Sequence, residues 1–319
     1  MRKIWNFVRN WTLPLAMLAG VAEYFVFVAL PLDGEVHRVT YVAVTQYVQP
    51  ILIFLMLFLS FLKVSPKEMR PHRWQAKTLA AQAGVFAAAS ALAMMMPDEG
   101  SRVLCEGAML SFICPTATAS AVVTGKLGGS VSGVVTYLML CNLLTSIMAP
   151  MFFPLVEPSD VHFFDAFLTI LGKVFPLLVC PLALAMTVRF LVRPLHRWLL
   201  QFKDLSFYLW AVSLSLAIAV TVRSIVHSSV GVWHLVGLAV VSGVCCQVQF
   251  RIGRSIGAKC GESEKITAGQ AFGQKNTVFI IWMGQMFLNP VTSVVGGFYS
   301  VWHNVVNSYQ LYEARKRGV

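Results

Sequence analysis

Five polar residues interrupt a segment that is otherwise apolar enough to cross a membrane. In "AGQAFGQKNTVFIIWMGQMF" the polar residues precede a run of large apolar side chains; they are Gln270, Gln274, Lys275, Asn276 and Thr277. An ionisable side chain inside a bilayer is costly, and such residues commonly mark the path of a substrate or an ion. Lys275 and its polar neighbours are therefore the first candidates for a binding site.

A second interruption occurs in "VLCEGAMLSFICPTATASAVVTGKLGG", where a Cys-Pro pair follows about ten residues of predicted helix. Thr116, Thr118 and Ser120 come directly after this pair. Ten helical residues rise ~15 Å, about half of the hydrocarbon core, so both interruptions are expected near the midplane. Close packing of small residues would explain one such kink. Two interruptions at matching positions in the two halves of the chain indicate instead the binding site of a transporter. The N–H and C=O groups of unwound backbone at this depth need protein or water as hydrogen-bond partners.

The composition sets the class of protein. The 319 residues are 57% hydrophobic and only 12% charged, with a mean hydropathy of +0.70. A polytopic membrane protein needs that much apolar surface, whereas a soluble core of this length does not. The formal charge of +11 lies mostly in short loops between apolar runs, so the expected partner is the lipid bilayer and not nucleic acid. The seven Cys lack the spacing of a disulfide framework or a zinc site, and we expect no metal and no cofactor.

Counting about 20 apolar residues per crossing predicts an all-α polytopic membrane protein with ten transmembrane helices. The predicted crossings are residues 12–31, 46–63, 77–96, 103–125, 130–154, 163–190, 205–223, 230–250, 265–288 and 290–312. With the N-terminus inside, most of the 25 Lys and Arg residues are cytoplasmic, so we expect both termini in the cytoplasm and a bacterial inner-membrane location. Discontinuous helices 4 and 9 run in opposite directions, which predicts two inverted five-helix repeats in which these helices cross.

Three motifs resemble the bile acid:sodium symporter family: "CPTATASAVVTGKLGGSVSG", "FGQKNT" and "YSVWHNVVNS". The resemblance covers most of the chain from about residue 46 onward. It implies a single transmembrane domain, 1–319, with two subdomains. The panel would comprise about 12–63 and 163–223, and the core about 77–154 and 230–312. Substrate would bind in the crevice between them.

The sequence departs from that family at the positions of its two sodium sites. Carried over position by position, the hydroxyl ligands of the fifth span fall at Val134 and Leu138, and the Glu shared by both sites falls at Ala271. A ligand Gln falls at Lys275. These losses leave too few oxygens for a hard cation, so the resemblance predicts a site without metal.

Lys275 is expected to place its ammonium where relatives hold a sodium ion. The three donors of this amine would bond unwound carbonyls together with Gln82, Thr118 or Ser120. Transport would then be proton-linked, with Lys275 losing and regaining a proton, or the amine would stay charged in a uniporter or exchanger. Snorkelling of the amine to an interface is the competing structural interpretation.

Other polar residues have predicted structural roles. Glu23 and Lys173 lie at similar depth in spans 1 and 6, which predicts an ion pair in the panel, either as a clamp or on the crevice wall. Gln82, His303 and Asn304 are predicted to brace the core. Glu106, near the start of span 4, is expected to be solvated.

We therefore expect a secondary active transporter of a small organic anion that works by alternating access without sodium. Three alternatives stay open: a sodium-coupled bile-acid-type symporter with rearranged ligands, an arsenite-type exporter that uses Cys114, and a membrane scaffold with no transport function. An enzyme is not expected, because the chain offers no paired catalytic groups at similar depth.

Overall fold

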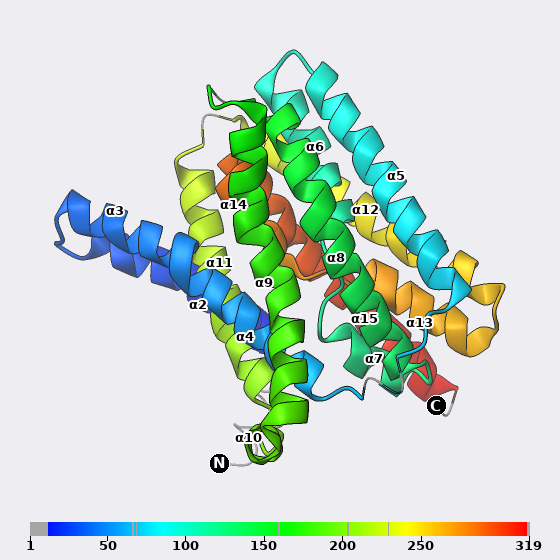
Figure 1. Ribbon diagram of the computed structural model, residues 1–319. Coiled ribbons are helices and arrows are strands. Elements are labelled where there is room, and N and C mark those ends of the chain that lie inside the picture. The colour runs from blue at the N-terminus through cyan, green and yellow to red at the C-terminus, as the bar shows by residue number, and fades with distance from the viewer. Residues whose placement is uncertain are drawn as a thin grey trace.

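The computed structural model describes residues 12–65, 67, 69–158, 160–202, 204–228 and 230–317. Arg2, Lys3, Arg9 and Lys203, on which part of the predicted orientation depends, lie outside these residues. The described elements, all helical, are α2 Thr12–Ala29, α3 Gly34–Ala43, η1 Val44–Val48, α4 Gln49–Leu62, α5 Arg73–Met95, α6 Glu99–Ile113, α7 Ser120–Lys126, α8 Val131–Val156, α9 Phe163–Leu191, α10 Arg193–Leu199, α11 Leu205–Val226, α12 Val232–Ala258, α13 Glu262–Gly273, α14 Thr277–Phe287, η3 Pro290–Ser293 and α15 Val294–Lys316 (Figure 1).

Seven helices within the described residues are long and apolar enough to cross a membrane. They are α2, the continuous α3–η1–α4 helix from Gly34 to Leu62, α5, α8, α9, α11 and α12. This pattern supports the prediction of an all-α membrane protein. The other three predicted crossings correspond to the interrupted pairs α6–α7 and α13–α14 and to the more polar α15, so they do not meet the same measure of length and apolarity.

The second predicted crossing begins earlier than expected, at Gly34 instead of residue 46. Its early part, "GEVHRVTYVA", has little apolar character, so counting apolar residues did not include it in the crossing. A π-helical turn at Val44–Val48 precedes Pro50, whose ring removes one N–H donor and disturbs the regular helix. Together with α2 this helix forms a hairpin that reaches out to the left of the bundle in Figure 1.

Helix α12 packs closely against α13, the helix that ends at the second interruption. A Cβ atom added at Gly253 would clash with the carbonyl oxygen of Ala268, and one added at Gly257 would clash with that of Glu264. Glycines spaced four residues apart let two membrane helices approach backbone to backbone. The position of α13 therefore depends on the absence of side chains at these two glycines.

We predict that Gly257→Ala lowers the free energy of unfolding by ~1–3 kcal/mol, because the added methyl group overpacks this contact. Thermal unfolding of purified protein in detergent measures the effect. Gly84→Ala is the matched control, since a Cβ on the exposed face of α5 at Gly84 meets no atom within 4 Å. Equal melting temperatures for the two variants would contradict the assigned role of the glycines.

Candidate functional site

The two interruptions meet inside the bundle. Thr116, between α6 and α7, faces Lys275, between α13 and α14, in an isolated antiparallel bridge. Two backbone hydrogen bonds flank this pair, from the N–H of Ala117 to the carbonyl of Gln274 at 3.1 Å and from the N–H of Asn276 to the carbonyl of Pro115 at 2.9 Å. The bonds satisfy backbone groups that two broken helices would otherwise leave open. We call the segments 114–119 and 274–276 the crossover.

The side chain of Lys275 is fully buried at the crossover. Its Nζ donates to the carbonyl of Phe112 at 3.2 Å and lies 5.1 Å from the ring centroid of Phe272. Phe112 belongs to the last turn of α6, where carbonyl groups lack helical partners and the negative end of the helix dipole lies. Lys275 is absent from the ion pairs formed by the described residues. A helix end and an aromatic face therefore hold the amine, and no carboxylate of the described residues pairs with it.

The side-chain partners predicted for Lys275 are wrong. Ser120 donates to the carbonyl of Ala117 at 2.6 Å, three residues back along its own chain. Thr118 is half-buried, and the side-chain oxygen of Gln82 accepts from the hydroxyl of Tyr137. The amine lies at the end of α6, where the carbonyl of Phe112 is an acceptor that the helix itself cannot satisfy.

Side chains from four helices, together with Thr116 of the crossover, bond four further carbonyls at the two broken ends. For α6, Gln249 of α12 donates to the carbonyl of Ser111 at 3.1 Å, and Gln82 of α5 and Thr145 of α8 donate to that of Ile113 at 3.0 and 2.7 Å. For α13, Thr116 donates to the carbonyl of Ala271 at 2.6 Å, and Tyr299 of α15 donates to that of Gly273 at 2.8 Å. Inside a membrane an unpaired carbonyl is costly, so these donors are what permits the breaks.

Sequence reasoning missed two of these donors, Gln249 and Tyr299. Gln249 and Tyr299 are both buried, and Gln249 also donates to the hydroxyl of Tyr299 at 3.1 Å. The available signal for Gln249 was the pair Gln247 and Gln249 in the otherwise apolar segment "VCCQVQF". Gln82 was singled out, and the structure places it between three helices: its amide bonds α6, and its carbonyl oxygen accepts from Tyr137 of α8 at 3.0 Å.

The predicted polar residues of the ninth span bond mainly to each other and to the backbone. The amide of Gln274 donates to the side-chain oxygen of Gln270, and Gln270 donates to Gln310 at 2.8 Å. Asn276 caps α14, because its Oδ1 accepts from the N–H of Phe279 at 3.3 Å. Thr277 is buried at the first position of α14. Of the predicted substrate-site residues, only Thr118 and Asn276 keep part of their surface exposed.

His303 and Asn304 of α15 do not make the bracing contacts that the sequence predicts for them. Asn304 donates to the carbonyl of Ser300 at 2.7 Å, one turn earlier on the same helix, so this bond connects no two helices. His303 packs edge to face on Tyr299, with ring centroids 5.8 Å apart, and its buried Nδ1 has no partner among the described residues. Two bonds instead join α15 to α13, from Tyr299 to the carbonyl of Gly273 and from Gln270 to Gln310.

The predicted ion pair between Glu23 and Lys173 is not among those that the described residues form. Glu23 accepts from the hydroxyl of Ser215 on α11 at 2.6 Å. The Nζ of Lys173 lies 6.0 Å from the ring centroid of Phe287. Depth along two helices can be estimated from sequence, but the direction in which each side chain points around its helix cannot.

The expectation for Glu106 is also wrong, because its side chain is fully buried in α6. Oε2 accepts from the hydroxyl of Thr292 in η3 at 2.5 Å, and Oε1 has no partner among the described residues. This contact ties the middle of α6 to the turn that leads into α15. The acidic residue that seemed to belong to the surface is therefore part of the packing between α6 and η3.

A comparison with models of known protein families finds none that matches the chain, and a search of curated proteins finds no match either. Sequence similarity therefore assigns no family. The resemblance to the bile acid:sodium symporter family stays an expectation, and function has to be inferred from the geometry of the crossover.

We predict that Thr116→Val lowers the free energy of unfolding by ~1–3 kcal/mol, because the buried carbonyl of Ala271 loses its donor. Thr118→Val is the matched control on the same segment, since Thr118 is half-buried and outside this network. Chemical or thermal unfolding in detergent compares the two variants. An equal loss in both would show that the bond to Ala271 does not stabilise the crossover.

Proposed function

We propose that the protein is a secondary active transporter of a small organic anion that works by alternating access and without sodium. The observation that carries this proposal is the pairing of two interrupted helices at Thr116 and Lys275, with a buried amine bound to one helix end. Interrupted helices at matching positions of two halves are the best sequence and structural pointer to a transporter's binding site.

The proposed architecture has ten crossings in two inverted repeats of five. It adds the broken pairs α6–α7 and α13–α14 and the polar α15 to the seven apolar helices. The broken pairs are then the fourth crossing of each half. We place both termini in the cytoplasm and the chain in a bacterial inner membrane, since most Lys and Arg residues then lie inside.

Independence from sodium is supported by the hydrogen bonds that carbonyl groups at the broken helix ends already accept from side chains. A hard cation needs several oxygen ligands. At the crossover, carbonyls of α6 and α13 already accept from Lys275, Gln82, Thr145, Gln249 and Tyr299. We propose that the ammonium group of Lys275 replaces the sodium ion that members of the bile acid:sodium symporter family, which the sequence resembles, bind at this place.

The choice of an anionic substrate follows from the charge of the same amine. Lys275 has no carboxylate partner among the ion pairs of the described residues, so its charge is left for a ligand. Ala117, Thr118, Ala119 and Asn276 form the part of the crossover that keeps exposed surface. A substrate carboxylate would meet the hydroxyl of Thr118 and the amide of Asn276 above the buried ammonium.

A closed contact between the proposed panel and core supports alternating access. Gln285 of α14 accepts from the hydroxyl of Tyr41 on α3 at 2.7 Å and donates to the hydroxyl of Ser224 on α11 at 2.5 Å. Trp282 donates to the carbonyl of Thr45 at 3.0 Å. We propose that these bonds close one side of the crevice and that they break when the transporter opens to that side.

Two alternatives are less well supported. Cys114 is fully buried and its thiol donates to the carbonyl of Asn276 at 3.1 Å, which favours a packing role over arsenite binding. Sodium coupling through rearranged ligands would have to displace the donors that already occupy the broken ends.

We predict uptake of at least one organic anion into proteoliposomes in sodium-free buffer. Lys275→Met should reduce this uptake about tenfold or more, as expected when a charge-assisted contact of ~1.5 kcal/mol is lost. Lys265→Met is the control, because Lys265 is on the outer surface of α13 and pairs with Glu262. Uptake that rises as the external pH falls indicates proton coupling, and a flat profile indicates uniport or exchange. A strict sodium requirement would contradict the proposal.

A further inference from the structure

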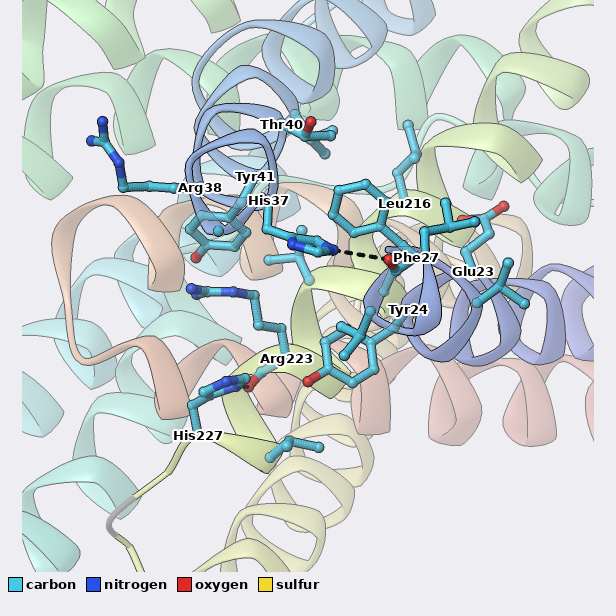
Figure 2. A pocket seen from close by; sticks show the side chains of 18 residues that line it. Glu23, Tyr24, Phe27, His37, Arg38, Thr40, Tyr41, Leu216, Arg223 and His227 are labelled. Atoms are coloured by element: carbon cyan, nitrogen blue, oxygen red, sulfur yellow. Dashed lines mark hydrogen bonds between the residues drawn. The ribbon is translucent and has the colours of Figure 1, made fainter. Parts of the chain in front are cut away.

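A cavity of about 900 Å³ lies between α2, α3 and α11, away from the crossover (Figure 2). Most of its wall is apolar, with Tyr24, Phe27, Leu216 and Val220 among the lining residues. Its volume is in the ~300–1,000 Å³ range of small-molecule sites. The transport proposal assigns no role to this cavity.

One end of the cavity is lined by a positively charged side chain, that of Arg223. In Figure 2 the side chain of Arg223, from the last turn of α11, points toward Tyr41, and its guanidinium carbon lies 3.9 Å from the ring centroid of Tyr41. Arg223, Tyr41 and His227 also line a second, more polar cavity of about 300 Å³, together with Ser224 and Asn289. The two cavities therefore share one charged corner.

The carboxylates around these cavities already have partners. Their contacts are Glu35 with Arg38 at 2.6 Å, Glu23 with the hydroxyl of Ser215 at 2.6 Å, and Glu99 with the amide of Asn289 at 2.6 Å. Arg223 is half-buried and is absent from the ion pairs of the described residues. A half-buried guanidinium favours an anionic partner, and none of these three carboxylates pairs with it.

The corner lies at the end of α11, and the end of a helix that crosses a membrane is at the level of the lipid head groups. Arg223 lies in the last turn of the apolar helix α11, whereas Ser215, the partner of Glu23, lies ~12 Å deeper along the same helix. The cavity thus extends from a charged end toward the hydrocarbon core. Large apolar side chains on the adjoining α2, including Phe25, Val26 and Val28, are exposed, so the occupant can enter from the lipid side.

We propose that this corner is a binding site for an anionic phospholipid. One acyl chain fills the apolar cavity between α2, α3 and α11, the phosphate bonds the guanidinium of Arg223, and the head group lies in the smaller cavity. The planar guanidinium offers paired N–H donors that suit phosphate oxygens. The lining residues do not include the crossover, although Tyr41 and Ser224 also belong to the contact proposed to close the crevice. The lipid site does not depend on the function proposed for the crossover.

Native mass spectrometry of the purified full chain tests this proposal with three probes: phosphatidylglycerol, phosphatidylcholine and palmitate. We expect the chain to bind phosphatidylglycerol about tenfold more tightly than phosphatidylcholine, and Arg223→Gln to remove most of this difference. Arg38→Gln is the matched control, because Arg38 lines the same cavity but is exposed and paired with Glu35. Ala219→Phe, which fills the cavity, should weaken the binding of both lipids.

Three results would overturn the assignment. The first is a preference for phosphatidylglycerol that survives in Arg223→Gln. The second is an equal loss in Arg38→Gln, which would indicate attraction by the general surface charge. The third is palmitate binding tighter than phosphatidylglycerol, which would make the ligand a free fatty acid. The melting temperature of each variant without added lipid shows whether it is folded.

Discussion

The structure depends on satisfying backbone carbonyls at two helix ends that lie inside the bundle. An interrupted helix exposes up to four C=O groups, and a membrane interior offers no water to bond them. Here α6 and α13 end next to each other, and donors reach them from α5, α8, α12 and α15. These four helices must therefore pack where their donor side chains can reach the ends of α6 and α13. The glycine contact between α12 and α13 serves the same end, because it brings Gln249 and the crossover close together.

Lys275 is the one donor of this set that carries a charge. Its amine contacts a carbonyl and an aromatic ring, which are weaker compensation for a buried cation than a carboxylate would be. Such a residue is costly for folding, so its presence at the crossover favours a role in binding or transport. The same reasoning separates Lys275 from Lys265, which is on the surface and paired with Glu262.

Much of the helix layout could be predicted from apolar length, and the breaks from "ICPTATAS" and "FGQKNT". The partners at the breaks could not. Gln82 and Lys275 were identified, but the carbonyls they bond depend on how each helix is rotated and how closely the neighbours pack. For the same reason Glu23 bonds Ser215 and not Lys173. The burial of Glu106 was missed because it depends on how η3 packs against α6, a contact between segments far apart in the sequence.

The central claim is that a fixed positive charge at the crossover holds two interrupted helices together. Chemical rescue of Lys275→Ala tests it most directly, because the substitution leaves a space the size of an alkylammonium ion beside the carbonyl of Phe112. Melting temperature is measured with propylammonium, with propanol as the neutral analogue, and with sodium. We expect propylammonium to raise the melting temperature of the variant and to leave that of the unsubstituted chain unchanged. Equal effects of propylammonium and propanol, or no rescue by either, would contradict it.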